Sequence, residues 1–258
     1  MRLSSVEQGT ASSEQGRRVV RSVPREGAPA EPVIATKLFV PALGTRPIER
    51  PRLYERLARA VDARLTLVVA PAGWGKSTLA AQWLRTLGVP SGWLSLDAAD
   101  GDVTRFWRYL VLAVQQADAS AGAAALRCLD TAGADVQRDV LPVLVNELAS
   151  TGDLVLVLDD YHVLGSRPVH QTLTALLDHA PGSLHLVVIS RSDPPLSLSR
   201  LRVAGDLVEI RAEHLRFTAE EAARMLDRAA VPDLSAADVQ RLVARTEGWA
   251  AGLQLAAL

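Results

Sequence analysis

Several residue types and patterns are scarce in this 258-residue chain, and each scarcity excludes a class of protein. Cysteine occurs once, at Cys128, so no disulfide can form within the chain and we expect a small buried side chain in a reducing compartment. The five histidines lack the H-x-x-x-H or Cys/His spacing of a zinc site. No stretch reaches the roughly 18 to 20 consecutive apolar residues of a membrane span, and the N-terminus lacks the apolar core of a secretory signal. We therefore expect a cytoplasmic protein without membrane contact.

The chain also has no marked excess of basic or acidic residues. The 28 basic and 29 acidic residues give a formal net charge of -1, so no overall field draws the chain onto nucleic acid or anionic lipid. Any contact with DNA must come from outside these residues. Lysine is rare as well, because it occurs only at Lys37 and Lys76 and all other basic residues are arginine. A lysine within a motif therefore stands out.

The composition that remains is typical of a globular protein. Hydrophobic residues make up 48% and charged residues 22%, and the length suits one large domain or two small ones. Residues 1–33 are rich in Ser, Glu, Gln, Gly and Arg and have few apolar residues to bury, so we predict a disordered tail there. Most of the tryptophans, Trp249 included, are expected in the core.

Short apolar runs alternate with amphipathic stretches along the middle of the chain. Each run is continuous, which is typical of strands in a sheet that helices cover on both faces. Strands separated by helices indicate an open parallel α/β sheet. The expected strands are 65–70, 92–96, 154–158, 184–190 and a weaker run at 207–210. The expected helices are 51–61, 77–87, 103–116 and 169–180.

The pattern changes near residue 212, after which no strand is expected. Thr218 and Glu221 have the spacing of a capping box, and Ser235 is placed to cap a further helix. We therefore predict an α/β domain over 34–212 and a small helical subdomain over 213–258. The apolar face of the last helix continues to the final residue, so we expect the chain to be a fragment of a longer protein.

The motif that carries chemistry follows the first expected strand and reads APAGWGKST. The pattern G-x-x-x-x-G-K-[ST] between a strand and a helix directs backbone N–H groups at a phosphate. Lys76 is expected to reach the β- and γ-phosphates, Ser77 to bind Mg²⁺ and Thr78 to add a hydroxyl group near the α-phosphate. The expected nucleotide-binding residues are Ala70, Pro71, Ala72, Gly73, Trp74, Gly75, Lys76, Ser77 and Thr78.

One position departs from this pattern, because Ala70 stands where the first glycine is usual. Gly73 and Gly75 remain, and both can adopt positive φ without a Cβ in the way. The alternative is a simple strand-to-helix turn with Lys76 as a solvated surface charge. The scarcity of lysine in this chain favours nucleotide binding over that alternative.

Two acidic residues follow the third expected strand, in the sequence LVLVLDDYH. A carboxylate at the C-terminal end of a strand neighbouring the loop strand is where a Mg²⁺ shell is held. We expect Asp159 to serve the metal and Asp160 to orient or deprotonate the attacking water. Because the Asp160 side chain is one methylene shorter than a glutamate base, it favours slow turnover.

The next strand ends in Ser190 and Arg191. An arginine at this position is suited to sensing or stabilising charge on the γ-phosphate. By residue type alone, a surface arginine paired with Asp193 fits equally well.

Taken together, these motifs resemble the MalT-like regulators, which are large ATP-binding LuxR-type transcription factors within the STAND class of signal-transduction NTPases. The resemblance covers roughly residues 35–258. Its marks are TKLFVP, RPRL, APAGWGKST, LVLVLDDYH, VVISRSDPPLSLSRLR, LRFTAEEA and TEGWAAGLQLAAL.

The resemblance implies a P-loop NTPase with an open parallel sheet between helices, followed by a small helical subdomain. It also implies a switch in which ATP and an inducer promote self-association, ADP marks the resting form, and Mg²⁺ accompanies the nucleotide. The inducer-sensing domain and the helix-turn-helix that binds DNA are not among these residues. By the resemblance, Lys76 binds phosphate, Ser77 and Asp159 bind Mg²⁺, and Arg191 is the sensor. Together with Asp160 as the base, the expected catalytic residues are Lys76, Asp160 and Arg191. The segment LFVP, residues 38–41, is similar to one that lines the base pocket.

Two other functions fit part of the sequence. A P-loop ATPase or kinase acting on a diffusible substrate would use the same loop, but residues 192–258 show neither an acceptor base nor a lid with catalytic arginines. A scaffold that has lost nucleotide binding is disfavoured because Lys76, Ser77 and Asp159 are intact.

Overall fold

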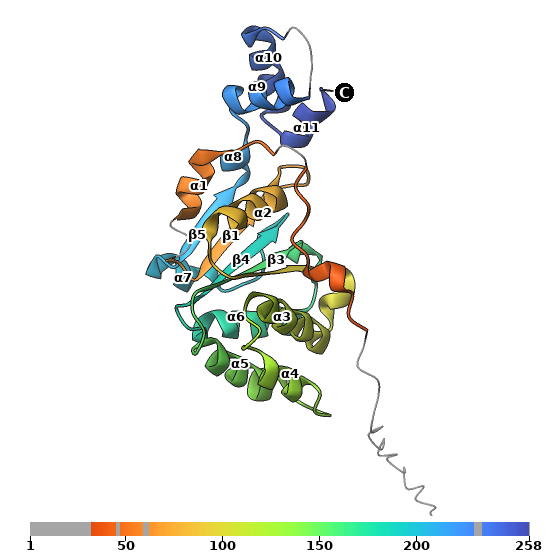
Figure 1. Cartoon of the computed structure of the whole chain (residues 1–258), viewed down its shortest axis with the longest axis vertical. Helices are drawn as coiled ribbons and strands as arrows, with labels where there is room; N and C mark the ends of the chain where they lie inside the picture. The colour runs from red at the N-terminus through yellow and green to blue at the C-terminus, as the bar shows by residue number, and fades with distance from the viewer. Residues whose placement is uncertain (1–31, 45–46, 59–61, 230–233, 258) are drawn as a thin grey trace, which may run out of the picture. The chain divides into compact units, whose positions relative to one another are not determined.

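The computed structural model describes residues 32–44, 47–58, 62–229 and 234–257 (Figure 1). Residues 1–31, nearly all of the predicted disordered tail, lie outside the described residues, so that prediction is untested. All structural statements below concern the described part of the chain.

The core element is a five-stranded sheet in which every pairing is parallel. The strand order is β2-β3-β4-β1-β5. The strands are β1 (Leu65–Val69), β2 (Ser91–Ser95), β3 (Leu154–Asp159), β4 (Leu184–Ser190) and β5 (Leu207–Arg211). Each coincides with an expected apolar run to within one residue at either end, which confirms the predicted open parallel sheet.

Helices occupy the connections between the strands and the region after the sheet. The longer ones are α1 (Pro51–Ala58), α2 (Lys76–Leu87), α3 (Val103–Ala117), α4 (Ala123–Leu129), α5 (Leu141–Leu148), α6 (Arg167–His179) and α7 (Leu198–Ala204). After β5 come α8 (Ala212–Leu215), α9 (Ala219–Arg228), α10 (Ala236–Thr246) and α11 (Ala250–Leu255). Short turns of tighter or wider helix are η1 (Ala35–Leu38), η2 (Ala98–Gly101), η3 (Val136–Val140) and η4 (Tyr161–Val163).

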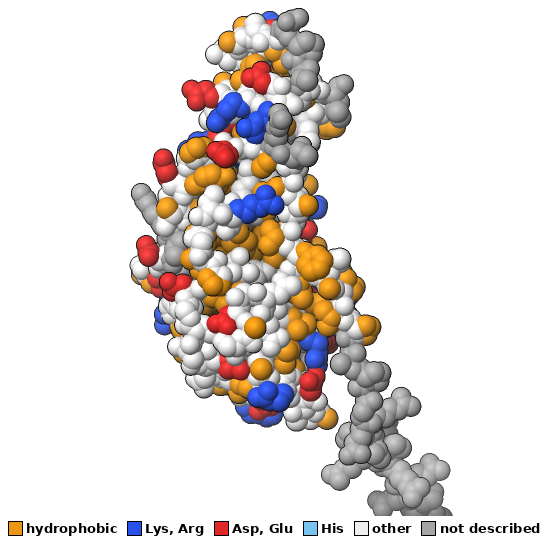
Figure 2. All heavy atoms as spheres, viewed as in Figure 1, with side chains coloured by type: hydrophobic (Ala, Val, Ile, Leu, Met, Phe, Trp, Pro, Cys, Tyr) orange, Lys and Arg blue, Asp and Glu red, His pale blue; other side chains and the backbone are white. Residues whose placement is uncertain are grey.

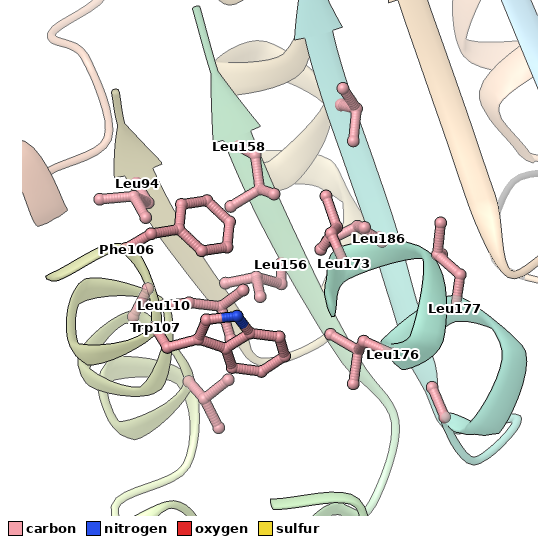
Figure 3. Close-up of a cluster of buried hydrophobic side chains, with 14 of the residues drawn as sticks. Leu94, Phe106, Trp107, Leu110, Leu156, Leu158, Leu173, Leu176, Leu177 and Leu186 are labelled. Carbon is pink, nitrogen blue, oxygen red and sulfur yellow. The ribbon is translucent and has the colours of Figure 1, made fainter. Parts of the chain in front are cut away.

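Both faces of the sheet are covered, which is why its strands are apolar without interruption. Alternate residues of β3 divide between two clusters, with Leu156 and Leu158 on one face and Val155 and Val157 on the other. The first face packs against α3, α4, α5 and α6, and Figure 3 shows Trp107 of α3 filling the space next to Leu156. The second face packs against α1 and α2.

The strand order corrects one sequence prediction. We expected Asp159 on a strand next to the loop strand, but β4 lies between β1 and β3. The strand that neighbours β1 on that side is β4, which ends at Ser190. Because all strands run parallel, their C-terminal ends still share one edge of the sheet, so Asp159 reaches the same region from two strands away.

The helices after β5 begin as the capping signals predict. Thr218 caps α9 with Glu221 in a reciprocal capping box, and Ser235 does the same for α10 with Asp238. Phe217, Ala222, Leu226, Val239 and Leu253 form a small core of their own. The division at residue 212/213 remains a prediction.

The face of the molecule drawn in Figure 2 shows, over the described residues, no large patch of charge of one sign. On the face drawn in Figure 2, acidic and basic side chains are interspersed, in line with the near-zero net charge. Within the described ranges, no helix combines the length and the apolar character that crossing a membrane requires.

Candidate nucleotide-binding site

The APAGWGKST loop joins β1 to α2 at the C-terminal edge of the sheet. The main chain turns through Gly73, with φ of 76°, and Gly75, with φ of 77°, both in the left-handed region that favours glycine. Gly75 then caps α2, whose first helical hydrogen bond runs from the Leu79 N–H to the Gly75 carbonyl, at 2.9 Å. The helix therefore begins at Lys76, as the motif predicts.

This loop presents a row of backbone donors. Within the described part of the chain, the N–H groups of Gly73, Gly75, Lys76, Ser77 and Thr78 donate no hydrogen bond. The first-turn donors are free because an α-helix has no intrahelical acceptor for them. Such donors at a helix N-terminus are suited to an anion, since the helix dipole adds positive potential there.

Lys76 lies beside these donors and is 7% exposed. Its Nζ donates to the Pro71 carbonyl at 2.9 Å, so the side chain folds back across the loop. Burial lowers the pKa of Lys76, and the carboxylates of Asp160 and Asp159 oppose that shift. A buried ammonium group with so few partners is stabilised by an anionic ligand.

Ser77 and Asp159 form the second part of the site. The Ser77 hydroxyl donates to Asp159 Oδ1 at 3.0 Å, which links the first turn of α2 to the end of β3. Burial raises the pKa of Asp159, the Ser77 hydrogen bond opposes this, and the Asp160 carboxylate adds to it. The paired oxygens are hard ligands of the kind that Mg²⁺ prefers.

Asp160 follows in a left-handed conformation, with φ of 57°, which is uncommon for a residue other than glycine. Its N–H donates to Asp159 Oδ1 at 2.9 Å, while its own side chain is 49% exposed. His162, which sequence reasoning did not single out, lies 3.8 Å from Asp160 Oδ1 through Nδ1, an atom that is buried and has no hydrogen-bond partner among the described residues. The only sequence signal for His162 was its place after the tandem aspartates.

Arg191 is exposed at the end of β4 and lines the same cavity as Asp160. It does not pair with Asp193, because that carboxylate is taken by Arg211. The structural alternative considered for Arg191 is therefore not realised.

A cavity of about 850 Å³ opens in front of the loop. Its floor comes from the phosphate loop and α2. Its walls come from Asp160, Arg191, the helices after β5 and four residues before α1, namely Gly44, Pro47, Ile48 and Arg50. The wall residues from those helices that sequence reasoning missed are Met225, Arg228, Ala229, Ala250, Ala251, Gln254 and Ala257.

Not every predicted residue faces the cavity. Ala72, Gly73, Gly75, Lys76, Ser77 and Thr78 line it. Ala70 is buried under the loop, Pro71 is exposed and supplies the carbonyl for Lys76, and Trp74 packs on the core beside α2.

Two further sequence expectations are corrected. LFVP, residues 38–41, does not line the cavity, because Leu38 packs into the core on the other face of the sheet; residues 44, 47, 48 and 50 line it instead. Trp249 is not a core residue but lies half-buried against the loop, where its indole N–H donates to the Ala72 carbonyl at 3.0 Å.

A parallel α/β sheet with this loop between β1 and the following helix α2 defines a P-loop NTPase. The sequence matches the AAA ATPase domain family over residues 46–189. The chain belongs to that family, whose fold and loop imply nucleotide binding.

The relatives confirm the resemblance to MalT-like regulators. The chain is 37% identical over 227 residues to the HTH-type transcriptional regulator MalT of Klebsiella pneumoniae subsp. pneumoniae, covering 88% of this chain and 25% of that protein. It is 35% identical over 229 residues to MalT of Vibrio cholerae, with 86% and 25% covered. The chain thus spans about a quarter of the length of the curated relatives it matches.

Solved structures confirm the fold. A signal transduction ATPase with numerous domains (STAND) and a tetratricopeptide repeat sensor from Pyrococcus horikoshii superposes with a TM-score of 0.61 at 16% identity, over 84% of this chain and 30% of that one. A Walker-type ATPase of Pyrococcus abyssi gives a TM-score of 0.52 at 16% identity, over 80% and 65%.

Proposed function

We propose that this chain is the ATP-binding switch domain of a MalT-like transcriptional regulator. Mg²⁺ and ATP bind at residues 70–78, slow hydrolysis leaves ADP, and the bound nucleotide controls self-association. Inducer sensing and DNA binding belong to segments outside these 258 residues. The observation that carries the proposal is the row of unpaired N–H groups from Gly73 to Thr78, beside Lys76 and open to the cavity.

The residues present fit a Mg²⁺ ion that is shared with phosphate. The described residues contain no group of three or more His, Cys, Asp or Glu side chains able to hold a metal by themselves. Mg²⁺ in nucleotide sites typically uses one or two protein oxygens together with phosphate oxygens, and Ser77 Oγ with the Asp159 carboxylate supplies such a pair. When bound, the ion contributes neutralisation of phosphate charge.

The side chains around the loop divide the remaining tasks. Lys76 exchanges the Pro71 carbonyl for phosphate oxygens, and Arg191 adds positive charge from the end of β4. Asp160 orients the attacking water and accepts its proton, a role for which its exposed carboxylate is accessible.

Titration calorimetry with Mg·ADP on Lys76→Ala tests nucleotide binding. We expect a loss of affinity of about tenfold to a hundredfold, because hydrogen bonds to a charged group are removed. Arg85→Ala is the matched control, since Arg85 is an exposed cation on the same helix, outside the cavity. Equal affinity in wild type and Lys76→Ala contradicts the proposal.

Steady-state hydrolysis tests the switch against an ATPase or kinase that acts on a diffusible substrate. A switch is expected to turn over more slowly than about 1 s⁻¹, at the low end of enzyme rates. Rapid turnover by the purified chain would favour the enzyme instead.

A further inference from the structure

The phosphate loop is held from outside by the last helix of the chain. The Trp249 indole N–H donates to the Ala72 carbonyl at 3.0 Å, and the Ala251 N–H donates to the Gly73 carbonyl at the same distance. Both acceptors belong to the loop, and both donors come from the start of α11. Two consecutive loop peptides are therefore anchored to a segment that follows them by more than 170 residues.

The turn before α11 is shaped to deliver this contact. Gly248 has φ of 70°, and a Cβ there would lie 2.8 Å from the backbone N and O of Phe217, whose N–H donates to the Gly248 carbonyl. A Cβ on Gly252 would lie 2.7 Å from Trp249 Cε3, so a side chain there would displace the indole from its place beside α11. On the loop side, a Cβ on Gly73 would lie 2.7 Å from the Ala251 Cβ and 2.8 Å from the indole nitrogen.

Anchoring a carbonyl also fixes the donor on the far side of the same peptide. The peptide unit is planar and trans, so the Ala72 carbonyl and the Gly73 N–H point in opposite directions and cannot turn independently. The Gly73 N–H is one of the donors left unpaired among the described residues. The indole of Trp249 therefore sets the direction of a group that faces the anion in the proposed function.

We infer that Trp249 is a positioning residue for polyphosphate binding. It holds the Ala72–Gly73 peptide in the orientation that binds phosphate, and it does so only while α11 is docked. Ala250, Ala251 and Gln254 of α11 also line the cavity, so displacement of this helix opens the cavity and releases the loop in one event. This inference rests on the proposed function. It identifies the Trp249 indole as the group that links the helices after β5 to the phosphate loop.

Trp249→Phe is the direct test, because it keeps an aromatic ring and removes the pyrrole part of the indole with its N–H. We expect the affinity for Mg·ADP to fall by about threefold to tenfold, the share of one neutral hydrogen bond. Trp107→Phe is the matched control: it also removes an indole N–H bonded at 2.8 Å, to Thr172 Oγ1, but in the core away from the cavity. The affinity of Trp107→Phe for Mg·ADP is expected to stay within about twofold of the wild-type affinity.

A spectroscopic readout tests whether the environment of Trp249 changes when the nucleotide binds. The tryptophan emission of wild type and of Trp107→Phe should change when Mg·ADP is added, and that change should be largely lost in Trp249→Phe. Wild-type affinity in Trp249→Phe, or equal losses in both variants, would overturn the inference.

Hydrogen exchange on the unmodified chain keeps the test valid if Trp249→Phe does not fold. Addition of Mg·ADP should protect residues 72–77 and 246–253 together, and protection of the loop alone would count against the inference. If the proposed function itself is wrong, the result is different: Mg·ADP does not bind the wild-type chain, or it binds Lys76→Ala equally well.

Discussion

At the scale of single residues, the site depends on backbone conformations that few side chains tolerate. Gly73 and Gly75 both have positive φ, but a Cβ on Gly75 would meet nothing within 4 Å, whereas one on Gly73 would collide with Ala251 and Trp249. Asp160 adopts the same region with a side chain, which places local strain beside the proposed reaction centre. Substitution at Gly75 therefore tests backbone strain alone, whereas substitution at Gly73 tests backbone strain together with a steric clash.

Alanine substitutions at these positions should differ in a graded way. Gly75→Ala is expected to cost about 1 to 2 kcal/mol of loop stability from backbone strain alone, and to weaken Mg·ADP binding accordingly. Gly73→Ala should weaken it more, because Ala251 must also move. Gly152→Ala, with ordinary φ and open space around it, is the control. Calorimetric titration of the three variants checks this order, which would be contradicted if Gly75→Ala were the weakest binder.

Asp160→Asn tests the assignment of the base. Asparagine accepts left-handed backbone, so the fold is retained while the carboxylate is lost. Hydrolysis is expected to fall by at least about a hundredfold, with Mg·ADP affinity unchanged within about twofold. A hydrolysis rate equal to that of wild type would assign the proton transfer elsewhere.

At the scale of elements, α1 and α9 are joined by a buried ionic cluster. Glu221, 3% exposed at its side chain, accepts from Arg52 through both oxygens at 2.8 Å and lies 3.3 Å from Arg50 Nε. Arg50 also donates to the Leu215 and Arg216 carbonyls and stacks over Phe217 at 4.4 Å. Burial lowers the pKa of Arg50 to about 10, so it stays charged at neutral pH. The cluster holds α9 against the start of α1.

Glu221→Gln should loosen this attachment. Removing one member of a buried charge cluster leaves Arg50 uncompensated, so we expect a loss of about 3 kcal/mol in the free energy of unfolding. Glu247→Gln removes an exposed ion pair with Arg216 and should cost less than about 1 kcal/mol. Urea unfolding of both variants measures the difference, and equal losses would contradict a special role for Glu221.

The difference in stability between wild type and Glu221→Gln should depend on pH. Burial alone would raise the pKa of Glu221, but the Arg52 hydrogen bond and the Arg50 charge outweigh it and the pKa is lowered. Because the folded value lies below the ordinary 4.5, this stabilisation is complete above pH 4.5 and is lost as pH falls through the folded value. The stability advantage of wild type over Glu221→Gln should therefore disappear in acid. A difference that persists below the folded pKa would refute this account.

Local pattern predicted much of the structure, and long-range contact explains most of what it missed. Strands such as Leu154–Asp159 were predictable because burial on both faces leaves an unbroken apolar run. The capping boxes at Thr218 and Ser235 and the loop itself are likewise local signals. By contrast, three features depend on residues far apart in sequence, and local periodicity does not predict such contacts. They are the position of β4 beside β1, the hydrogen bond from the Trp249 indole to Ala72, and the stacking of Arg50 over Phe217.

At the scale of the whole molecule, the chain contains the fold and the loop of a P-loop NTPase but spans only about a quarter of the length of its MalT relatives. Its cavity is built from three separate parts of the chain, namely the residues Gly44, Pro47, Ile48 and Arg50 before α1, the sheet edge with its loops, and the helices after β5. A ligand that fills this cavity would lie against all three parts. In the proposed function, the nucleotide state changes how these parts fit together.

Self-association should follow the nucleotide if this coupling operates. Sedimentation velocity with a non-hydrolysable ATP analogue and Mg²⁺ is expected to show a larger species than with Mg·ADP. Lys76→Ala should give the smaller species under both conditions. Identical sedimentation of wild type in both nucleotides would contradict nucleotide-controlled assembly by these residues alone.

The backbone amides of the loop provide the most direct observation of polyphosphate binding. In a ¹⁵N-labelled sample of the wild-type chain, addition of Mg·ADP should shift the amide proton resonances of Gly73, Gly75 and Lys76 through Thr78 downfield, because these N–H groups acquire phosphate acceptors. Loop resonances that stay in place while the nucleotide binds elsewhere, or does not bind, would contradict the assignment of this loop as the phosphate site.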